Sequence, residues 1–159
     1  MLAVAEPTVA ARIAASAGRG TEAIALLRQA VAAEDHLAYN EPSEWFFPAR
    51  HLLGAQLLLA GDAAQAEQTY RQDLKRNPSN GWALRGLATA LAAQGKKRDA
   101  ARVSHEFAGA WSHADIRLPG SAFWFAGADT ADCGCEHLSS AERQAGRVLL
   151  RAQHEARID

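Results

Sequence analysis

The feature that most constrains the fold is a pattern in residues 47–80 that recurs in residues 81–114. A shift of about 34 residues, the length of a helix–turn–helix repeat, superimposes the two stretches. Leucines, alanines and a glycine then coincide, in the pairs Ala49/Ala83, Leu53/Leu87, Leu57/Leu91, Gly61/Gly95 and Ala66/Ala100. We therefore expect two helical hairpins that bury their apolar faces by stacking on one another.

The spacing of these residues agrees with a pair of antiparallel helices. Leu53 and Leu57 share one helix face because they are four residues apart. Gly61 can end the first helix in the left-handed conformation, and Asp62 can cap the second. The small side chain of Ala66 allows two helix backbones to approach where they cross. Residues 47–80 are therefore expected to form one complete hairpin.

A resemblance to a known family follows from the same stretch. Its features are a leucine–glycine pair, a turn glycine, a small residue, a tyrosine and a closing proline, at Leu53, Gly54, Leu57, Gly61, Ala66, Tyr70 and Pro78. With these residues the chain resembles the tetratricopeptide repeat (TPR) family. Residues 39–91 are similar to bacterial TPR proteins of uncharacterised role. The resemblance implies an all-α, TPR-like helix–turn–helix solenoid and no particular reaction.

The rest of the chain is expected to extend or close this solenoid. We expect a solenoid over 1–118, with a degenerate repeat at 4–37, a connector at 38–46 and repeats at 47–80 and 81–114; an irregular linker at 119–138; and a C-terminal capping helix at 139–157. Ser139 and Glu142 have the spacing of a capping box that would open the last helix. The weak first repeat is interpreted as a cap, or as the edge of a longer array of which this chain is the C-terminal part.

Within these parts, several apolar side chains are expected to pack inward. In the degenerate repeat, Val9 and Ile13 are the larger apolar residues of the first helix, and Thr21 is a plausible cap for the second. The aromatic residues of the connector, Tyr39, Trp45 and Phe46, are expected to pack on the seam between repeats. A stripe of apolar residues with helical spacing is expected in the core, namely Ala100, Val103, Phe107 and Trp111.

Composition and charge narrow the classes of partner. A net charge of −1 gives no electrostatic reason to expect nucleic acid or a membrane surface as partner. No apolar run approaches the roughly 18 residues that a membrane helix needs. The N-terminus lacks the basic and long apolar regions of a signal peptide, which favours the cytoplasm. A periplasmic location is the alternative if the chain is a mature or trimmed form.

No catalytic pattern is present, and one short strip could bind a metal. Cys133, Cys135 and His137 alternate, so an extended segment would project two thiolates and an imidazole to one side. Zinc requires a fourth ligand, for which the candidates are Asp132, Glu136 and His113, whereas copper(I) can do with fewer. The alternatives are an oxidised pair of cysteines or thiols without chemistry. A second cluster of possible metal ligands consists of Glu34, Asp35 and His36. It is interpreted as a solvated helix face.

The resemblance to TPR proteins also implies a binding surface. In that family, exposed residues of the first helices line a concave face that holds peptides. The matching positions are His51, Ala55, Leu58, Trp82, Arg85 and Thr89. The lysine and asparagine pattern that clamps a terminal carboxylate in chaperone-binding TPRs is absent. We therefore expect a non-catalytic scaffold that binds a protein or peptide segment and needs no cofactor. A zinc- or copper-binding accessory protein that uses the cysteine strip is the alternative.

Overall fold

The computed structural model describes residues 2–38 and 45–122, and these residues form helices and their connections without any strand. The helices are α1 (Leu2–Ser16), α2 (Gly20–Asp35), α3 (Ala49–Leu59), α4 (Ala63–Arg76), α5 (Gly81–Ala93) and α6 (Lys97–Ala110). The expectation of an all-α protein is confirmed for this part of the chain. The expected linker beyond residue 122 and the helix at 139–157 lie outside the described residues.

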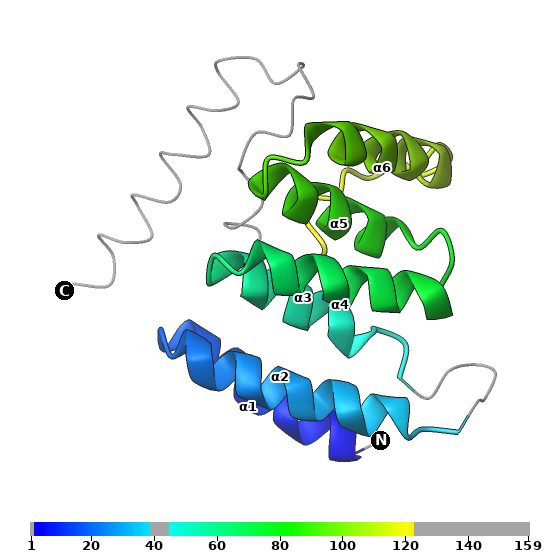
Figure 1. Ribbon diagram of the computed structural model, residues 1–159. Coiled ribbons are helices and arrows are strands. Elements are labelled where there is room, and N and C mark those ends of the chain that lie inside the picture. Colours follow the sequence, from blue (N-terminus) through cyan, green and yellow to red (C-terminus); the bar gives the residue numbers. More distant parts are fainter. Residues whose placement is uncertain (1, 39–44, 123–159) are drawn as a thin grey trace.

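The helices are stacked in the order of the chain (Figure 1). Each helix packs against the next, and α3 also contacts α5 directly. Three antiparallel hairpins result, namely α1 with α2, α3 with α4, and α5 with α6. The first helices α3 and α5 and the second helices α4 and α6 thus lie in two layers.

The same glycine turn closes each hairpin. Gly18, Gly61 and Gly95 have φ angles of 75°, 80° and 73°, which a residue with a side chain adopts only with strain. After α3, the amide of Gly61 donates to the Leu58 carbonyl at 3.0 Å and that of Asp62 to the Leu57 carbonyl at 2.9 Å. This double hydrogen bond satisfies carbonyls left free at the helix end. The same pair of hydrogen bonds recurs after α1 and α5, and the expected helix-ending role of Gly61 is confirmed.

Side-chain caps open two of the helices, and the one at Asp62 is the expected cap. The Asp62 carboxylate accepts from the Gln65 amide at 3.0 Å, and the Asn80 side-chain oxygen accepts from the Ala83 amide at 3.2 Å. The expected cap at Thr21 is wrong. Helix α2 already begins at Gly20, so its cap position falls on Arg19, whose side chain makes no capping hydrogen bond.

The core is built from the leucines and alanines of the repeated pattern. Leu53, Leu57 and Ala66 are buried, which confirms their expected inward orientation. The expectation for α1 is wrong, because Val9 and Ile13 are 56% and 59% exposed. The buried face of α1 instead carries Val4, Thr8, Ala11 and Ala14.

The junction between α2 and α3 is held by carboxylates rather than left in solvent. Glu34 accepts from the Ala49 amide at 2.9 Å and so caps α3 from the preceding helix. Asp35 accepts two hydrogen bonds from Arg50, at 2.7 and 2.6 Å, and also pairs with Arg76. The Arg50 hydrogen bonds hold the pKa of Asp35 below its usual value, whereas burial raises the pKa of Glu34. The interpretation as a solvated face is therefore wrong for Glu34 and Asp35, whereas His36 is exposed as expected.

The connector before α3 contributes one aromatic side chain to this junction. Trp45 is partly buried and packs against a small cluster of Val4, Ala30 and Ala49. Phe46 is 90% exposed, so its expected packing on the seam is wrong. Neighbouring residues of an irregular segment point in different directions, and only one of the two can face the helices. Tyr39 lies outside the described residues.

Candidate functional site

The centre of the α3–α4–α5 packing is the ring of Tyr70, which is fully buried. Gly54 of α3 and Gly86 of α5 lie against the ring from the two neighbouring helices. A Cβ atom added at Gly54 would be 2.8 Å from the Tyr70 hydroxyl oxygen, and one added at Gly86 would be 2.7 Å from it. The two glycines therefore make the space in which the tyrosine reaches through to the opposite face.

On that face the Tyr70 hydroxyl meets a residue far along the chain. Its oxygen lies 2.5 Å from Ser121 Oγ, and Ser121 Oγ in turn donates to the His51 carbonyl at 3.3 Å. Because the serine proton is directed to the carbonyl, the tyrosine hydroxyl is the donor to Ser121. The hydrogen bonds join α4, α3 and the segment that follows α6.

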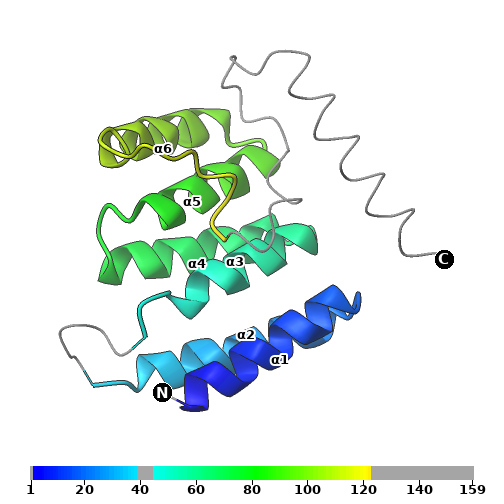
Figure 2. The same ribbon diagram turned by 180° about the vertical axis from the view of Figure 1, so that it is seen from behind.

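This segment, residues 118–122, crosses the layer of first helices. In Figure 2 the chain after α6 (yellow) runs back across α5 towards α3. Leu118 is 6% exposed, and Ser121 and Ala122 are completely buried. Gly120 is buried as well, whereas Pro119 is exposed. The surface of α3 and α5 thus holds a short non-helical segment of the same chain, which we call the strap (residues 118–122).

A buried hydrogen bond between side chains supports α3 from the side of α4. His51 Nε2 lies 3.0 Å from Asp73 Oδ2, and each side chain is 1% exposed. Asp73 also accepts from the Asn77 side-chain amide at 3.1 Å. The other ring nitrogen of His51 has no hydrogen-bond partner. With its ring held in this way, His51 offers its backbone carbonyl to the strap and does not offer its side chain.

Aromatic rings continue along the edge of the same layer. Phe47 lies edge-on to His51, with ring centroids 5.5 Å apart, and to Trp82 at 6.0 Å. Trp111 stands edge-on to Trp82 at 6.2 Å and stacks on Phe107 at 5.9 Å. Edge-to-face and stacked pairs stabilise packing beyond the area they bury. This row of rings holds the C-terminal end of α6 against α5. The chain leads from that end of α6 to the strap.

The expected binding residues divide into two groups. His51, Ala55 and Thr89 are buried, so the expectation that these side chains are exposed is wrong. Helix α3 is the central helix, and every residue from Ala49 to Leu57 is buried by its neighbours. The remaining expected residues are partly exposed, namely Leu58, Trp82 and Arg85.

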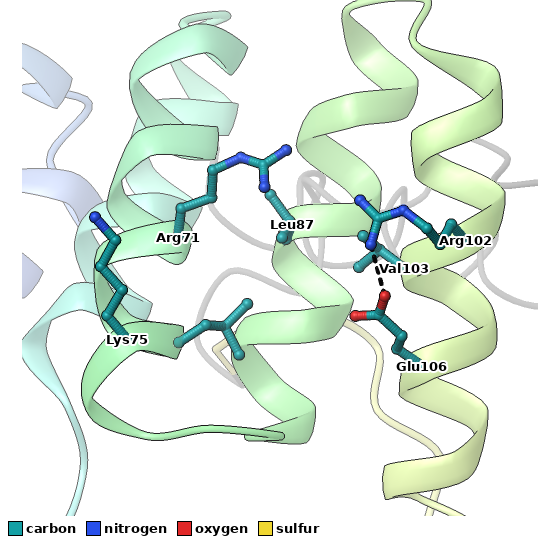
Figure 3. A pocket seen from close by; sticks show the side chains of 7 residues that line it. Arg71, Lys75, Leu87, Arg102, Val103 and Glu106 are labelled. Carbon is teal, nitrogen blue, oxygen red and sulfur yellow. Dashed lines mark hydrogen bonds and ion pairs between the residues drawn. The ribbon is translucent and has the colours of Figure 1, made fainter.

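A hollow of about 300 Å³ lies on the other layer, between α4 and α6. Figure 3 shows Arg71 and Lys75 on the α4 side, Arg102 and Glu106 on the α6 side and Leu87 between them. Arg71 pairs with Glu67 at 2.8 Å, and Arg102 pairs with Glu106 at 2.6 Å. Two of the three cations are thus balanced by carboxylates already in place, and we assign this hollow no ligand.

The expected metal strip lies elsewhere in the chain. Cys133, Cys135 and His137, with the further candidates Asp132 and Glu136, are outside the described residues. His113 is described and is exposed. Across residues 2–38 and 45–122, no group of three or more His, Cys, Asp or Glu side chains could hold a metal ion.

Sequence reasoning missed the residues that join the strap to the helices. Ser121 falls in the predicted irregular linker at 119–138, and Gly86 has no sequence feature that separates it from its helix neighbours. One signal was available, because Asp73 follows Tyr70 by three residues and so places a carboxylate on the inner face of α4. A charge at such a position requires a buried partner, which His51 supplies.

Comparison of the chain with protein-family models, with curated proteins and with solved structures finds no match. Among the described helices, none has both the length and the apolar character to cross a membrane. The function is therefore argued from the geometry of this chain alone.

Proposed function

We propose that the chain is a TPR-like repeat module that binds a polypeptide segment of another protein on the α3–α5 surface, without catalysis. The repeated glycine turns and the Tyr70 packing between successive hairpins support the repeat assignment. Stacked repeats of this kind present an extended surface on which a partner can lie.

The observation that carries the proposal is the position of the strap. Leu118, Ser121 and Ala122 are buried on this surface although they belong to no helix. A surface that buries one non-helical segment and satisfies its serine hydroxyl has the shape and the polar groups to hold another. We therefore place the binding site for the partner where the strap lies.

We propose that the partly exposed residues of α3 and α5 form the edge of this site. Trp82 and Arg85 project from α5, and Leu58 lies near the end of α3. An aromatic ring and an arginine are residue types that often dominate binding energy in interfaces. We propose that the partner contacts these side chains in addition to the strap position.

The experiment is to select peptides from a random library on the full-length chain and to measure their affinity by fluorescence anisotropy. Arg85→Glu should weaken the selected peptides at least tenfold, which corresponds to about 1.4 kcal/mol. Arg98→Glu, at an exposed position of α6, is the matched charge reversal and should change nothing. The proposal is wrong if no peptide is selected, or if both reversals weaken binding equally.

A further inference from the structure

We infer that the strap is a tethered copy of the ligand, so that the partner segment shares its chemistry and binds by displacing it. This inference rests on the proposed function and adds the identity of the ligand. The partner segment carries a leucine, then a turn, then two small residues of which the first has a hydroxyl. Each of these requirements follows from one part of the strap.

The size requirement comes from burial. Ser121 and Ala122 are 0% exposed, and the Tyr70 hydroxyl lies 2.5 Å from Ser121 Oγ. A larger side chain at either position would displace the tyrosine or the backbone of α3, because well-packed interiors have no room for added atoms. The ligand is therefore limited to small residues at these two positions.

The hydroxyl requirement comes from hydrogen bonding. Ser121 Oγ accepts from Tyr70 and donates to the His51 carbonyl. Alanine at this position would remove an acceptor from a buried hydroxyl, which is costly in an apolar interior. A carboxylate would bring a charge into the same site, at a greater cost. Serine satisfies both groups within the available space.

The leucine and the turn define the other half of the ligand. Leu118 is 6% exposed and is the apolar anchor of the strap. Pro119 is exposed and Gly120 is buried, so the chain turns outward at one residue and inward at the next. Proline is common in turns because its ring fixes φ, and a glycine adds no side chain where the strap enters the surface. The spacing of leucine and serine is thus set by the turn.

Competition follows from the covalent connection. A segment joined to its site by a short linker is present at an effective concentration of about millimolar. A free peptide with the same sequence must displace it. Its apparent association constant therefore equals the intrinsic constant multiplied by the small fraction of sites that are open. The intact chain should therefore bind such a peptide weakly, and a chain with a damaged strap should bind it more tightly.

The test uses a fluorescent peptide with the sequence of residues 113–122 and the full-length chain carrying Leu118→Asp with Ser121→Glu. Both substitutions are in the strap and leave α3, α4 and α5 unchanged. We expect the peptide to bind this variant at least tenfold more tightly than it binds the unaltered chain. Ile116→Asp, at a position 51% exposed just before the strap, is the matched control and should bind as the unaltered chain does.

Altered peptides test the ligand chemistry. With alanine in place of its serine, the peptide should bind the strap variant at least threefold more weakly, and with glutamate it should not bind measurably. Equal affinity for the strap variant and the unaltered chain would overturn the inference, as would tight binding of the glutamate peptide. Circular dichroism determines whether the variant is folded.

If the strap variant does not fold, nuclear magnetic resonance of the unaltered, isotope-labelled chain decides. Saturating peptide should shift the amide signals of Gly120 and Ser121, and unchanged signals would overturn the inference.

Library selection on the folded variant separates this inference from the proposed function. Selected peptides that lack a serine followed by a small residue would overturn the ligand chemistry alone, whereas a complete lack of binders would overturn both.

Discussion

At the scale of single residues, Tyr70 sets the distance between three helices. Its ring fills the space left by Gly54 and Gly86, and its hydroxyl emerges at Ser121. A tyrosine can do this because its body is apolar and its tip is polar. The two glycines are needed because any side chain at these positions would meet the ring.

Gly86→Ala should therefore destabilise the protein, although alanine is the better helix former. The added methyl group would lie 2.7 Å from the Tyr70 hydroxyl oxygen, and overpacking of this kind costs about 1–3 kcal/mol. Gly109→Ala is the matched control, since nothing lies within 4 Å of its added Cβ. Urea denaturation should show a lower free energy of unfolding for Gly86→Ala and no decrease for Gly109→Ala. Equal effects would contradict this account of the Tyr70 site.

At the scale of the helices, the hairpins share a turn but differ in how the second helix begins. Asp62 caps α4 with its carboxylate, whereas Arg19 and Lys96 occupy the same position in the other hairpins without a side-chain cap. Asp62→Ala should cost about 0.5–2 kcal/mol, the usual loss for a removed cap. Arg19→Ala at the equivalent position should change the free energy of unfolding by less than about 0.5 kcal/mol. Thermal denaturation measures both variants. Equal decreases in the melting temperatures of Asp62→Ala and Arg19→Ala would contradict the assigned cap.

The junction of α2 and α3 depends on the pair of Asp35 and Arg50. The Arg50 side chain is 7% exposed, so loss of its carboxylate partner would leave a largely buried charge. Asp35→Ala should cost about 1.5–3 kcal/mol, the range for hydrogen bonds to charged groups. Glu22→Ala breaks the exposed pair with Arg19, whose side chains are 53% and 52% exposed, and should cost less than about 1 kcal/mol. Denaturant titration measures the free energy of unfolding of Asp35→Ala and Glu22→Ala. Similar decreases in the two variants would contradict a special role for Asp35.

At the scale of the whole molecule, Glu67 links the last two hairpins. It accepts from Lys96 and from Gln94, each at 2.8 Å, and pairs with Arg71 of its own helix. The hydrogen bond from Lys96, followed by those from Arg71 and Gln94, lowers the pKa of Glu67 from 4.5 to about 2. The ionised carboxylate is thus favoured in the folded protein.

This shift makes a prediction about acid stability. Because the pKa of Glu67 is lower in the folded than in the unfolded chain, its contribution is complete above pH 4.5 and is lost as the pH falls towards about 2. Glu67→Gln should be less stable than the unaltered protein at pH 7, and the difference should shrink at pH 2.5. Urea denaturation at both values measures it. A difference that stays constant would show that Glu67 does not carry the effect.

Much of the hairpin architecture was determined by the sequence itself. Gly61 with Asp62 ends one helix and opens the next through contacts among residues close in the chain, so their roles could be predicted from type and spacing. Leu53 and Leu57 were assigned to the core because their four-residue spacing selects one helix face. The partner-binding and metal-binding expectations remain predictions.

Other features were decided only by the tertiary structure. In the alanine-rich α1 several faces can pack, and close approach of α2 selected the face of Ala11 and Ala14 over that of Val9 and Ile13. Ser121 reaches Tyr70 across 51 residues, and no local pattern encodes such a contact. Local hydrogen bonds and periodicity thus determine where helices begin and end. Which face is buried, and what covers the first helices, depends on segments that meet only when the chain has folded.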